Sequence, residues 1–184
     1  HRLEVVVGTL TRDVAVLVLR LVHVHGREHA LGVPVVNQAI WRLPGRIDPG
    51  EFAALGRTLS CGRLARLVDR TPFPQRDRWI HTRAAGAHRF CEKAIAAHEI
   101  PAWARRQAEV GVDAVVGPAW RLTAVYVDDT GETAVSWVNS HVIADGGAVI
   151  TGVEEAVAGE TFDVTDARAG VGDTVREGAR LSLI

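Results

Sequence analysis

The sequence predicts an α/β fold, in which a mixed β-sheet is flanked by helices. Three observations lead to this prediction. Short runs rich in Val and Leu recur along the chain and are typical of strands. Segments with apolar residues at helical spacing lie between them. The length of 184 residues suffices for one ordinary domain with its own core, and not for two large ones.

The N-terminal part of the chain contains three predicted strands, each rich in Val and Leu. They cover residues 3–7, 14–24 and 35–43. Pro44 and Gly45 close the third strand, because neither residue continues a strand easily.

The sequence DPGEF predicts the start of a helix. Asp48 is the expected N-cap, Pro49 occupies the first helical position, and Glu51 completes a capping box. The apolar residues that follow recur on one helical face, namely Phe52, Leu55 and Leu59.

The middle of the chain is predicted to be mostly helical. Residues 60–70 are expected to continue as helix or turn, and residues 71–77 to form an extended loop, since Pro72 and Pro74 oppose helix there. Two further helices are predicted over residues 89–97 and 101–110.

A β-hairpin is the clearest unit of the C-terminal part. Residues 119–127 and 133–143 alternate as strands, and the sequence DDTGE between them predicts a tight turn. Asp128 and Asp129 are therefore interpreted as turn residues and not as a catalytic pair. A helix is predicted over 146–158, and residues 161–184 read as a polar tail.

Composition excludes several classes of protein. The formal net charge of −1 gives no general attraction to nucleic acid or to a membrane surface. Cys61 and Cys91 form no disulfide framework and no zinc-binding pattern, which favours a reducing cytoplasm. No apolar run is long enough to span a membrane, and no signal peptide is recognisable. The chain lacks methionine, so we interpret it as a trimmed or partial product, and its arginine-rich, lysine-poor composition favours a bacterial source.

Positive charge is concentrated between Arg57 and Arg89, where eight arginines stand against Asp69 and Asp77. One interpretation is an ordinary solvated face. The other is a surface that meets an anionic group, such as a phosphate on a cofactor or carrier.

The stretch WVNSHVIADGG carries the main candidate for chemistry. It places His141 near the end of a predicted strand, on the same face as Asn139 and Ile143, with Asp145 and Gly146 just beyond. A neutral imidazole at a strand end can accept a proton from a hydroxyl, amine or thiol. The alternative is a structural role for both residues: His141 would cap the strand end with its hydrogen bonds satisfied, and Asp145 would be the N-cap of the next helix.

The chain resembles the N-terminal half of the chloramphenicol-acetyltransferase-like superfamily, which contains CoA-dependent acyltransferases and the condensation domains of nonribosomal peptide synthetases. The resemblance covers about residues 34–160. It rests on the motif H-x-x-x-D-G in SHVIADGG (140–147), and on two stretches that match by position, NQAIWRLPGRIDPGEFAALGRTLSCGRLAR (37–66) and GPAWRLTAVYVDDTGETAVSW (117–137).

The resemblance implies a role for each motif residue. His141 would act as general base on the acceptor nucleophile, which attacks an acyl thioester, and would also help to hold the tetrahedral intermediate. Asp145 would be structural, through a salt bridge with an arginine, and Gly146 would keep the substrate channel open. The implied co-substrate is acyl-CoA or a phosphopantetheine-carried thioester, with no bound cofactor or metal, and the acceptor is a small molecule or a carrier-bound group.

The sequence also departs from the family. Ser140 stands where condensation domains usually have a first histidine, which favours the acyltransferase branch, and Ala148 replaces a frequent serine. Full-length members carry a second, similar half, so a second half-domain or a homo-oligomer is an expected partner. The chain thus divides into residues 1–33 outside the resemblance, an acyltransferase-like half-domain over 34–160, and the tail over 161–184.

Other functions remain open. The chain would be a non-catalytic interaction module if it keeps half of the acyltransferase fold without its activity. The spacing of His23, His25 and His29 permits a zinc site, although the neighbouring residues do not match a known hydrolase motif. Ser60 and Cys61 lie before Gly62, where packing or capping is the ordinary role. Core packing is likewise the ordinary role for Trp41, Trp103 and Trp120.

Overall fold

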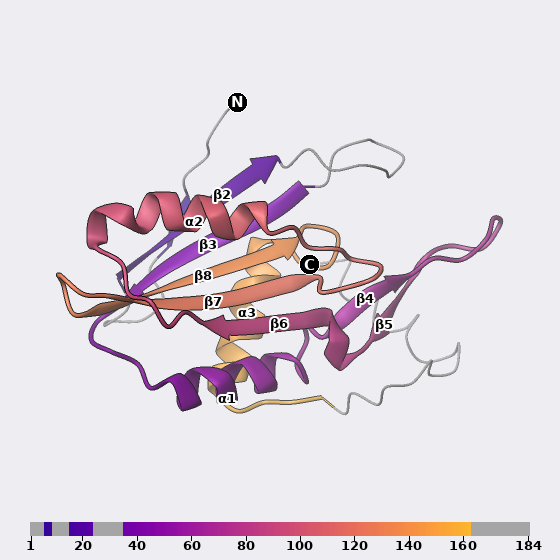
Figure 1. Cartoon of the computed structure of the whole chain (residues 1–184). Helices are drawn as coiled ribbons and strands as arrows, with labels where there is room; N and C mark the ends of the chain where they lie inside the picture. The colour runs from indigo at the N-terminus through magenta and orange to yellow at the C-terminus, as the bar shows by residue number, and fades with distance from the viewer. Residues whose placement is uncertain (1–5, 9–14, 24–34, 163–184) are drawn as a thin grey trace.

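The computed structural model describes residues 6–8, 15–23 and 35–162 (Figure 1). The predicted tail from residue 163 onward and most of residues 1–33 lie outside the described residues. The elements, in chain order, are β1 (Val6–Gly8), β2 (Ala15–His23), β3 (Val35–Leu43), α1 (Pro49–Leu59), β4 (Arg66–Asp69), β5 (Arg78–His81), a 3-10 turn (Arg83–Ala85), β6 (Gly86–Phe90), a second 3-10 turn (Ala97–Glu99), α2 (Ile100–Glu109), β7 (Trp120–Val127), β8 (Glu132–Ser140) and α3 (Gly146–Val157).

Six strands form one sheet in the order β1-β2-β3-β8-β7-β6. All neighbours are antiparallel except β6 and β7, which run parallel. The sheet is therefore mixed, and it is flanked by helices, as the sequence predicts. None of the helices in the described part of the chain has the length and apolar composition that crossing a membrane requires.

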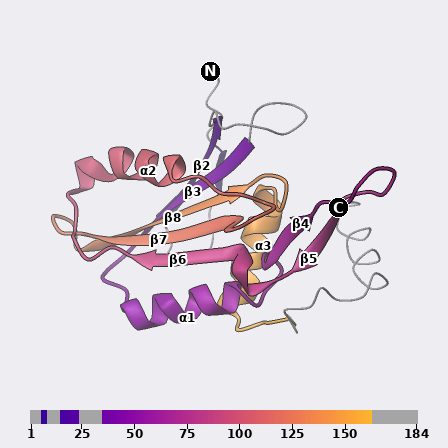
Figure 2. The ribbon, with the colours of Figure 1, turned by 45° about the vertical axis from the view of Figure 1, so that its right-hand side comes forward.

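The helices cover both faces of the sheet, with α2 on one face and α1 and α3 on the other (Figures 1 and 2). The alternation of side chains along β7 explains this arrangement. Trp120, Leu122 and Ala124 point into the larger core under α1 and α3. Val125 and Val127 point into the smaller core under α2.

Tryptophans form the centre of the larger core. The rings of Trp120 and Trp137 stack with centroids 4.9 Å apart. A hydrogen-bond partner for the N–H stabilises a buried indole. Trp120 Nε1 donates to the Leu64 carbonyl at 3.0 Å, and Trp137 Nε1 donates to Asn139 Oδ1 at 2.9 Å. Trp41 and Trp103 are also buried, as the apolar patterns predict.

The predicted N-cap Asp48 and first helical residue Pro49 of α1 are confirmed, whereas the described hydrogen bonds do not include the capping-box bond expected from Glu51. Asp48 Oδ1 accepts from the amides of Gly50 and Glu51 at 2.8 and 3.0 Å, and Pro49 is the first helical residue. These contacts satisfy amides that have no partner inside the helix.

Parts of two segments, one predicted as helix and one as helix or turn, are strands. Residues 86–90, which overlap the predicted helix 89–97, form β6 and pair in parallel with β7. The extended chain continues along β7, because the Cys91 amide donates to the Ala124 carbonyl at 2.8 Å and the Ile95 amide to the Tyr126 carbonyl at 3.0 Å. Residues 66–69 form β4 instead of continuing a helix. The predicted helix at 101–110 is confirmed as α2.

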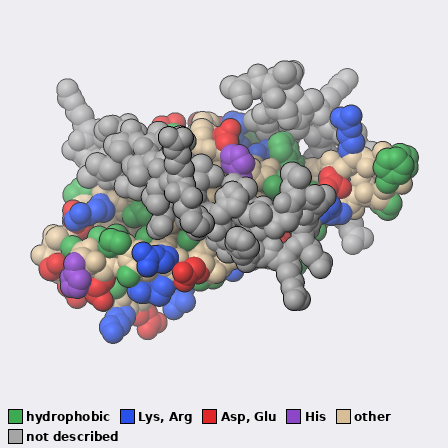
Figure 3. Space-filling view, turned by 90° about the horizontal axis from the view of Figure 1, so that it is seen from above, with side chains coloured by type: hydrophobic (Ala, Val, Ile, Leu, Met, Phe, Trp, Pro, Cys, Tyr) green, Lys and Arg blue, Asp and Glu red, His purple; other side chains and the backbone are tan. Residues whose placement is uncertain are grey.

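Strands β4 and β5 form a separate two-stranded ribbon that projects from the body of the protein (Figures 1 and 2). Its connecting segment contains Pro72 and Pro74 and is not helical, as predicted. Phe73 lies in this segment with 96% of its surface exposed. Hydrophobic side chains are visible at this projecting end in the view from above (Figure 3).

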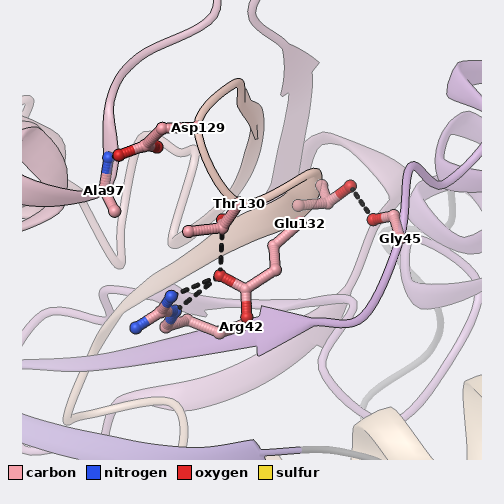
Figure 4. A network of polar contacts seen from close by, with 7 residues as sticks. Arg42, Gly45, Ala97, Asp129, Thr130 and Glu132 are labelled. Carbon is pink, nitrogen blue, oxygen red and sulfur yellow. Dashed lines mark hydrogen bonds and ion pairs between the residues drawn. The ribbon is translucent and has the colours of Figure 1, made fainter.

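A polar network holds the β7–β8 hairpin turn (Figure 4). Arg42 and Thr130 both donate to the carboxylate of Glu132, and these two hydrogen bonds lower the pKa of Glu132. Asp129 Oδ1 accepts from the Ala97 amide at 2.8 Å, and Asp128 pairs with Arg46 at 2.7 Å. Both aspartates are therefore structural turn residues, as predicted.

Candidate active site

Strand β8 ends at Ser140, three residues before the predicted end at Ile143. The Ile143 amide donates to the Ser140 carbonyl at 3.1 Å, so the chain turns here instead of extending. His141 is consequently in a turn, and the prediction that it shares a strand face with Asn139 and Ile143 is wrong. We call residues 141–145 the site turn.

The site turn separates polar from apolar side chains. Ile143 and Ala144 are 0% and 3% exposed and belong to the larger core. His141 is exposed, and Val142 beside it is 61% exposed. Burying two apolar side chains fixes the turn against the core, and the imidazole is then presented outward.

Three buried side chains hold the backbone carbonyls of this region. Asn37 Nδ2 and Asn139 Nδ2 donate to the Ala144 carbonyl at 2.9 and 2.8 Å. Asn139 Nδ2 also donates to the Ser140 carbonyl at 2.8 Å, and Arg66 Nε donates to the Ile143 carbonyl at 2.8 Å. These bonds satisfy buried acceptors that would otherwise be costly, so the turn has a defined conformation.

The two asparagines come from neighbouring strands. Asn37 on β3 lies directly opposite Asn139 on β8 in the register of the sheet. Both are buried, with 3% and 0% of their surface exposed. Their amide groups therefore converge on one carbonyl oxygen from two strands.

Arg66 is a buried cation behind the site turn. It is 4% exposed, and its guanidinium lies 3.9 Å from the centre of the Trp79 ring. Burial lowers the pKa of Arg66 to about 10, the charge of Arg63 acts in the same direction, and the charge of Asp145 acts against both. Arg66 is thus the arginine near the motif aspartate, and its hydrogen bonds go to the Ile143 carbonyl.

Asp145 is the N-cap of α3. Its Oδ1 accepts from the Ala148 amide at 2.8 Å, and no ion pair of Asp145 is present in the described part of the chain. The carboxylate also lies at the positive end of the helix dipole. The capping role that the sequence left open is therefore present. Gly146 is the first residue of α3.

Among the residues that the structure describes, His141 has one hydrogen-bond partner. Its Nδ1 lies 3.0 Å from Asn37 Nδ2. Asn37 belongs to the stretch NQAIW and was not among the predicted site residues. The sequence feature that could have pointed to Asn37 is the polar pair Asn37 and Gln38 between apolar residues of the strand, since a buried polar residue needs a specific partner. Gln38 faces the other core and donates to the Ala104 carbonyl at 2.6 Å.

The other predicted candidates in the described part of the chain do not join this site. Ser60 is the C-cap of α1, and its Oγ donates to the Gly56 carbonyl at 2.9 Å, which agrees with a capping role. His25 and His29 lie outside the described residues. Within the segments that the structure describes, no group of His, Cys, Asp and Glu side chains is arranged to hold a metal.

Much of the basic stretch is balanced locally. Arg63 pairs with Glu155 at 2.5 Å, Arg78 with Asp69 at 2.6 Å, and Arg70 with Asp77 at 3.6 Å. These three arginines have acidic partners within the protein, which agrees with the interpretation as an ordinary face and not with an anion-binding surface at these positions.

Comparison with known proteins gives a clear answer for the fold alone. No protein-family model matches the chain, and no curated protein does. Among solved structures, the chain is similar to the starter condensation domain of rhizomide synthetase RzmA, with a TM-score of 0.52 and 16% identity over 81% of this chain and 38% of that one. It is also similar to the tallysomycin biosynthesis protein TlmII, with a TM-score of 0.52 and 18% identity over 80% of this chain and 40% of that one.

A third similar structure is the SgcC5 protein from Streptomyces globisporus, with a TM-score of 0.51 and 19% identity over 66% of this chain and 29% of that one. The chain therefore spans well under half of the length of each of these structures. The predicted fold class is confirmed: the chain has a mixed β-sheet flanked by helices, and it shares this fold with the starter condensation domain of RzmA.

Proposed function

We propose that the chain is an acyltransferase-like half-domain that takes part in acyl transfer from a thioester to a hydroxyl or amine. The donor would be acyl-CoA or a phosphopantetheine-linked acyl group. The observation that carries the proposal is the exposed ring of His141 on a turn held by three buried side chains. The backbone of such a site is held in place, and its histidine is accessible to a substrate. The fold is shared with the starter condensation domain of RzmA.

The proposed reaction moves an acyl group from the thioester sulfur to the acceptor. A lone pair of the acceptor attacks the thioester carbonyl carbon, the C–S bond breaks, and the sulfur leaves as a thiol after gaining the proton that the acceptor loses. The resemblance gives His141 the role of general base for that proton. Asp145, as cap of α3, and Gly146, at the start of that helix, would support the turn and leave room beside it.

A partner is part of the proposal. The structures similar to this chain are longer, and the chain spans 38% of the RzmA condensation domain. A second half-domain or another copy of this chain would supply the opposite wall of the substrate site. The proposed thioester donors are cytoplasmic metabolites and carriers, which is consistent with a cytoplasmic protein.

The test is acyl transfer by the complete gene product, with release of free thiol measured for a panel of acyl-CoA and acyl-pantetheine thioesters in the presence of amines and alcohols. We expect thiol release that depends on the acceptor and falls at least about a hundredfold in His141→Ala. Equal rates in the wild type and in His141→Ala would refute the role of His141.

A non-catalytic interaction module is the second candidate. It is favoured by two exposed hydrophobic side chains, Phe73 and Val142, which a protein partner could cover. Light scattering and acyl-CoA titration distinguish the two candidates. A monomer that binds no acyl-CoA supports the module, whereas an oligomer that binds it supports the acyltransferase.

A further inference from the structure

The orientation of the Asn37 amide is fixed by chemistry. The Ala144 carbonyl oxygen can only accept a hydrogen bond, and the Asn37 amide lies 2.9 Å from it, so the group facing it must be the NH2. The same nitrogen lies 3.0 Å from His141 Nδ1. Both hydrogens of the Asn37 amide are therefore used, one on a carbonyl and one on the imidazole.

This contact selects one form of the histidine. A nitrogen that accepts a hydrogen bond carries no proton, so His141 Nδ1 has a free lone pair directed at Asn37. In a neutral imidazole the proton then resides on the other nitrogen, Nε2. A ring with its proton on Nδ1 would place that N–H against the N–H of Asn37, which is 3% exposed and held by its second hydrogen bond.

We propose that Asn37 is a positioning residue that fixes His141 in the tautomer with the proton on Nε2. The inference rests on the proposed function and revises the role of His141 within it. The exposed side of the ring meets the substrate as a hydrogen-bond donor, suited to the thioester carbonyl oxygen as negative charge develops there. His141 keeps its proton throughout, and the proton that the acceptor loses ends on the departing sulfur.

The tautomer can be measured directly, without any substrate. Long-range 1H–15N correlation spectra of the 15N-labelled chain at mildly alkaline pH distinguish a protonated from an unprotonated ring nitrogen. The His141 signals are assigned by their loss in His141→Ala. We expect an unprotonated Nδ1 and a protonated Nε2 in the wild type. A protonated Nδ1, or shifts that equal those of free histidine, would overturn the proposal even if the Asn37 variants failed to fold.

Variants of Asn37 separate positioning from structure. Asn37→Ala is expected to move the His141 shifts to the average of the two tautomers, and Asn37→Asp, which offers an acceptor, is expected to reverse the tautomer. Asn139→Ser is the matched control, because Asn139 also donates to the Ala144 carbonyl and none of its described hydrogen bonds goes to His141. The control is expected to leave the tautomer unchanged. Unchanged shifts in a folded Asn37→Ala would overturn the proposal.

The kinetic readout distinguishes failure of this inference from failure of the proposed function. With acyl transfer present, Asn37→Ala is expected to lower kcat about tenfold, the factor that one hydrogen bond supplies, with little change in KM. If neither the wild type nor the variants transfer acyl groups, the proposed function fails, and the spectra still decide the tautomer. If transfer occurs with kcat unchanged in Asn37→Ala, the positioning role is refuted.

Discussion

Replacing Arg66 with methionine is predicted to change the free energy of unfolding by no more than about 1 kcal/mol. The loss has two parts: about 1–3 kcal/mol for a buried carbonyl left without its donor, and about 1 kcal/mol for the contact with Trp79. The substitution also removes the free-energy cost of burying the charge of Arg66. Lowering the pKa from 12.5 to about 10 corresponds to a cost of about 3 kcal/mol, so the two sums nearly cancel.

Equilibrium unfolding in urea, followed by tryptophan fluorescence, measures the change for Arg66→Met. A loss of about 3–5 kcal/mol, typical of breaking a buried ion pair, would refute the reasoning and would indicate that Asp145 pairs directly with Arg66. Asp145→Asn is the matched control, because asparagine keeps the helix cap and removes only the charge. It is expected to cost less than about 1 kcal/mol, since Asp145 is exposed.

Two further predictions concern the sheet. Because hydrogen bonds from Arg42 and Thr130 lower the pKa of Glu132, its contribution to stability is full above the ordinary value of 4.5 and is lost as the pH falls through the lower, folded-state pKa. The urea midpoint of the wild type should therefore exceed that of Glu132→Gln at pH 7, and the gap should close on acidification; a constant gap would contradict this. Gly86→Ala should destabilise the protein by about 1–3 kcal/mol, because the new Cβ would overlap the Trp120 ring. If urea unfolding shows the variant to be as stable as the wild type, the packing of Gly86 against Trp120 is contradicted.

Local features of the fold could be predicted from the sequence. The bounds of β3 and the cap of α1 depend on neighbouring residues, and the hairpin depends on the turn at residues 128–132. Strand β6 was missed, and its last two residues were predicted as helix, because its pairing with β7 joins residues more than thirty positions apart, as in Gly86 opposite Trp120. Tertiary pairing overrides local propensity in such segments.

The site shows the same limit. His141, Asp145 and Gly146 lie within six residues and could be proposed from one motif. Asn37 and Arg66 reach the same turn from 107 and 77 positions away, so no local pattern could connect them with it. The early end of β8 was also missed, because the apolar residues Val142 and Ile143 continue the strand pattern, although only Ile143 is buried.

The role of His141 in acyl transfer is tested most directly by mass-spectrometric detection of the acylated acceptor, formed by the complete gene product from one thioester donor. The wild type should form the acylated acceptor and release one thiol for each acyl group transferred. The His141→Ala variant, with the same fold by circular dichroism, should form it at least about a hundredfold more slowly. Acylated acceptor formed at the same rate by both proteins would contradict the proposed function of this site.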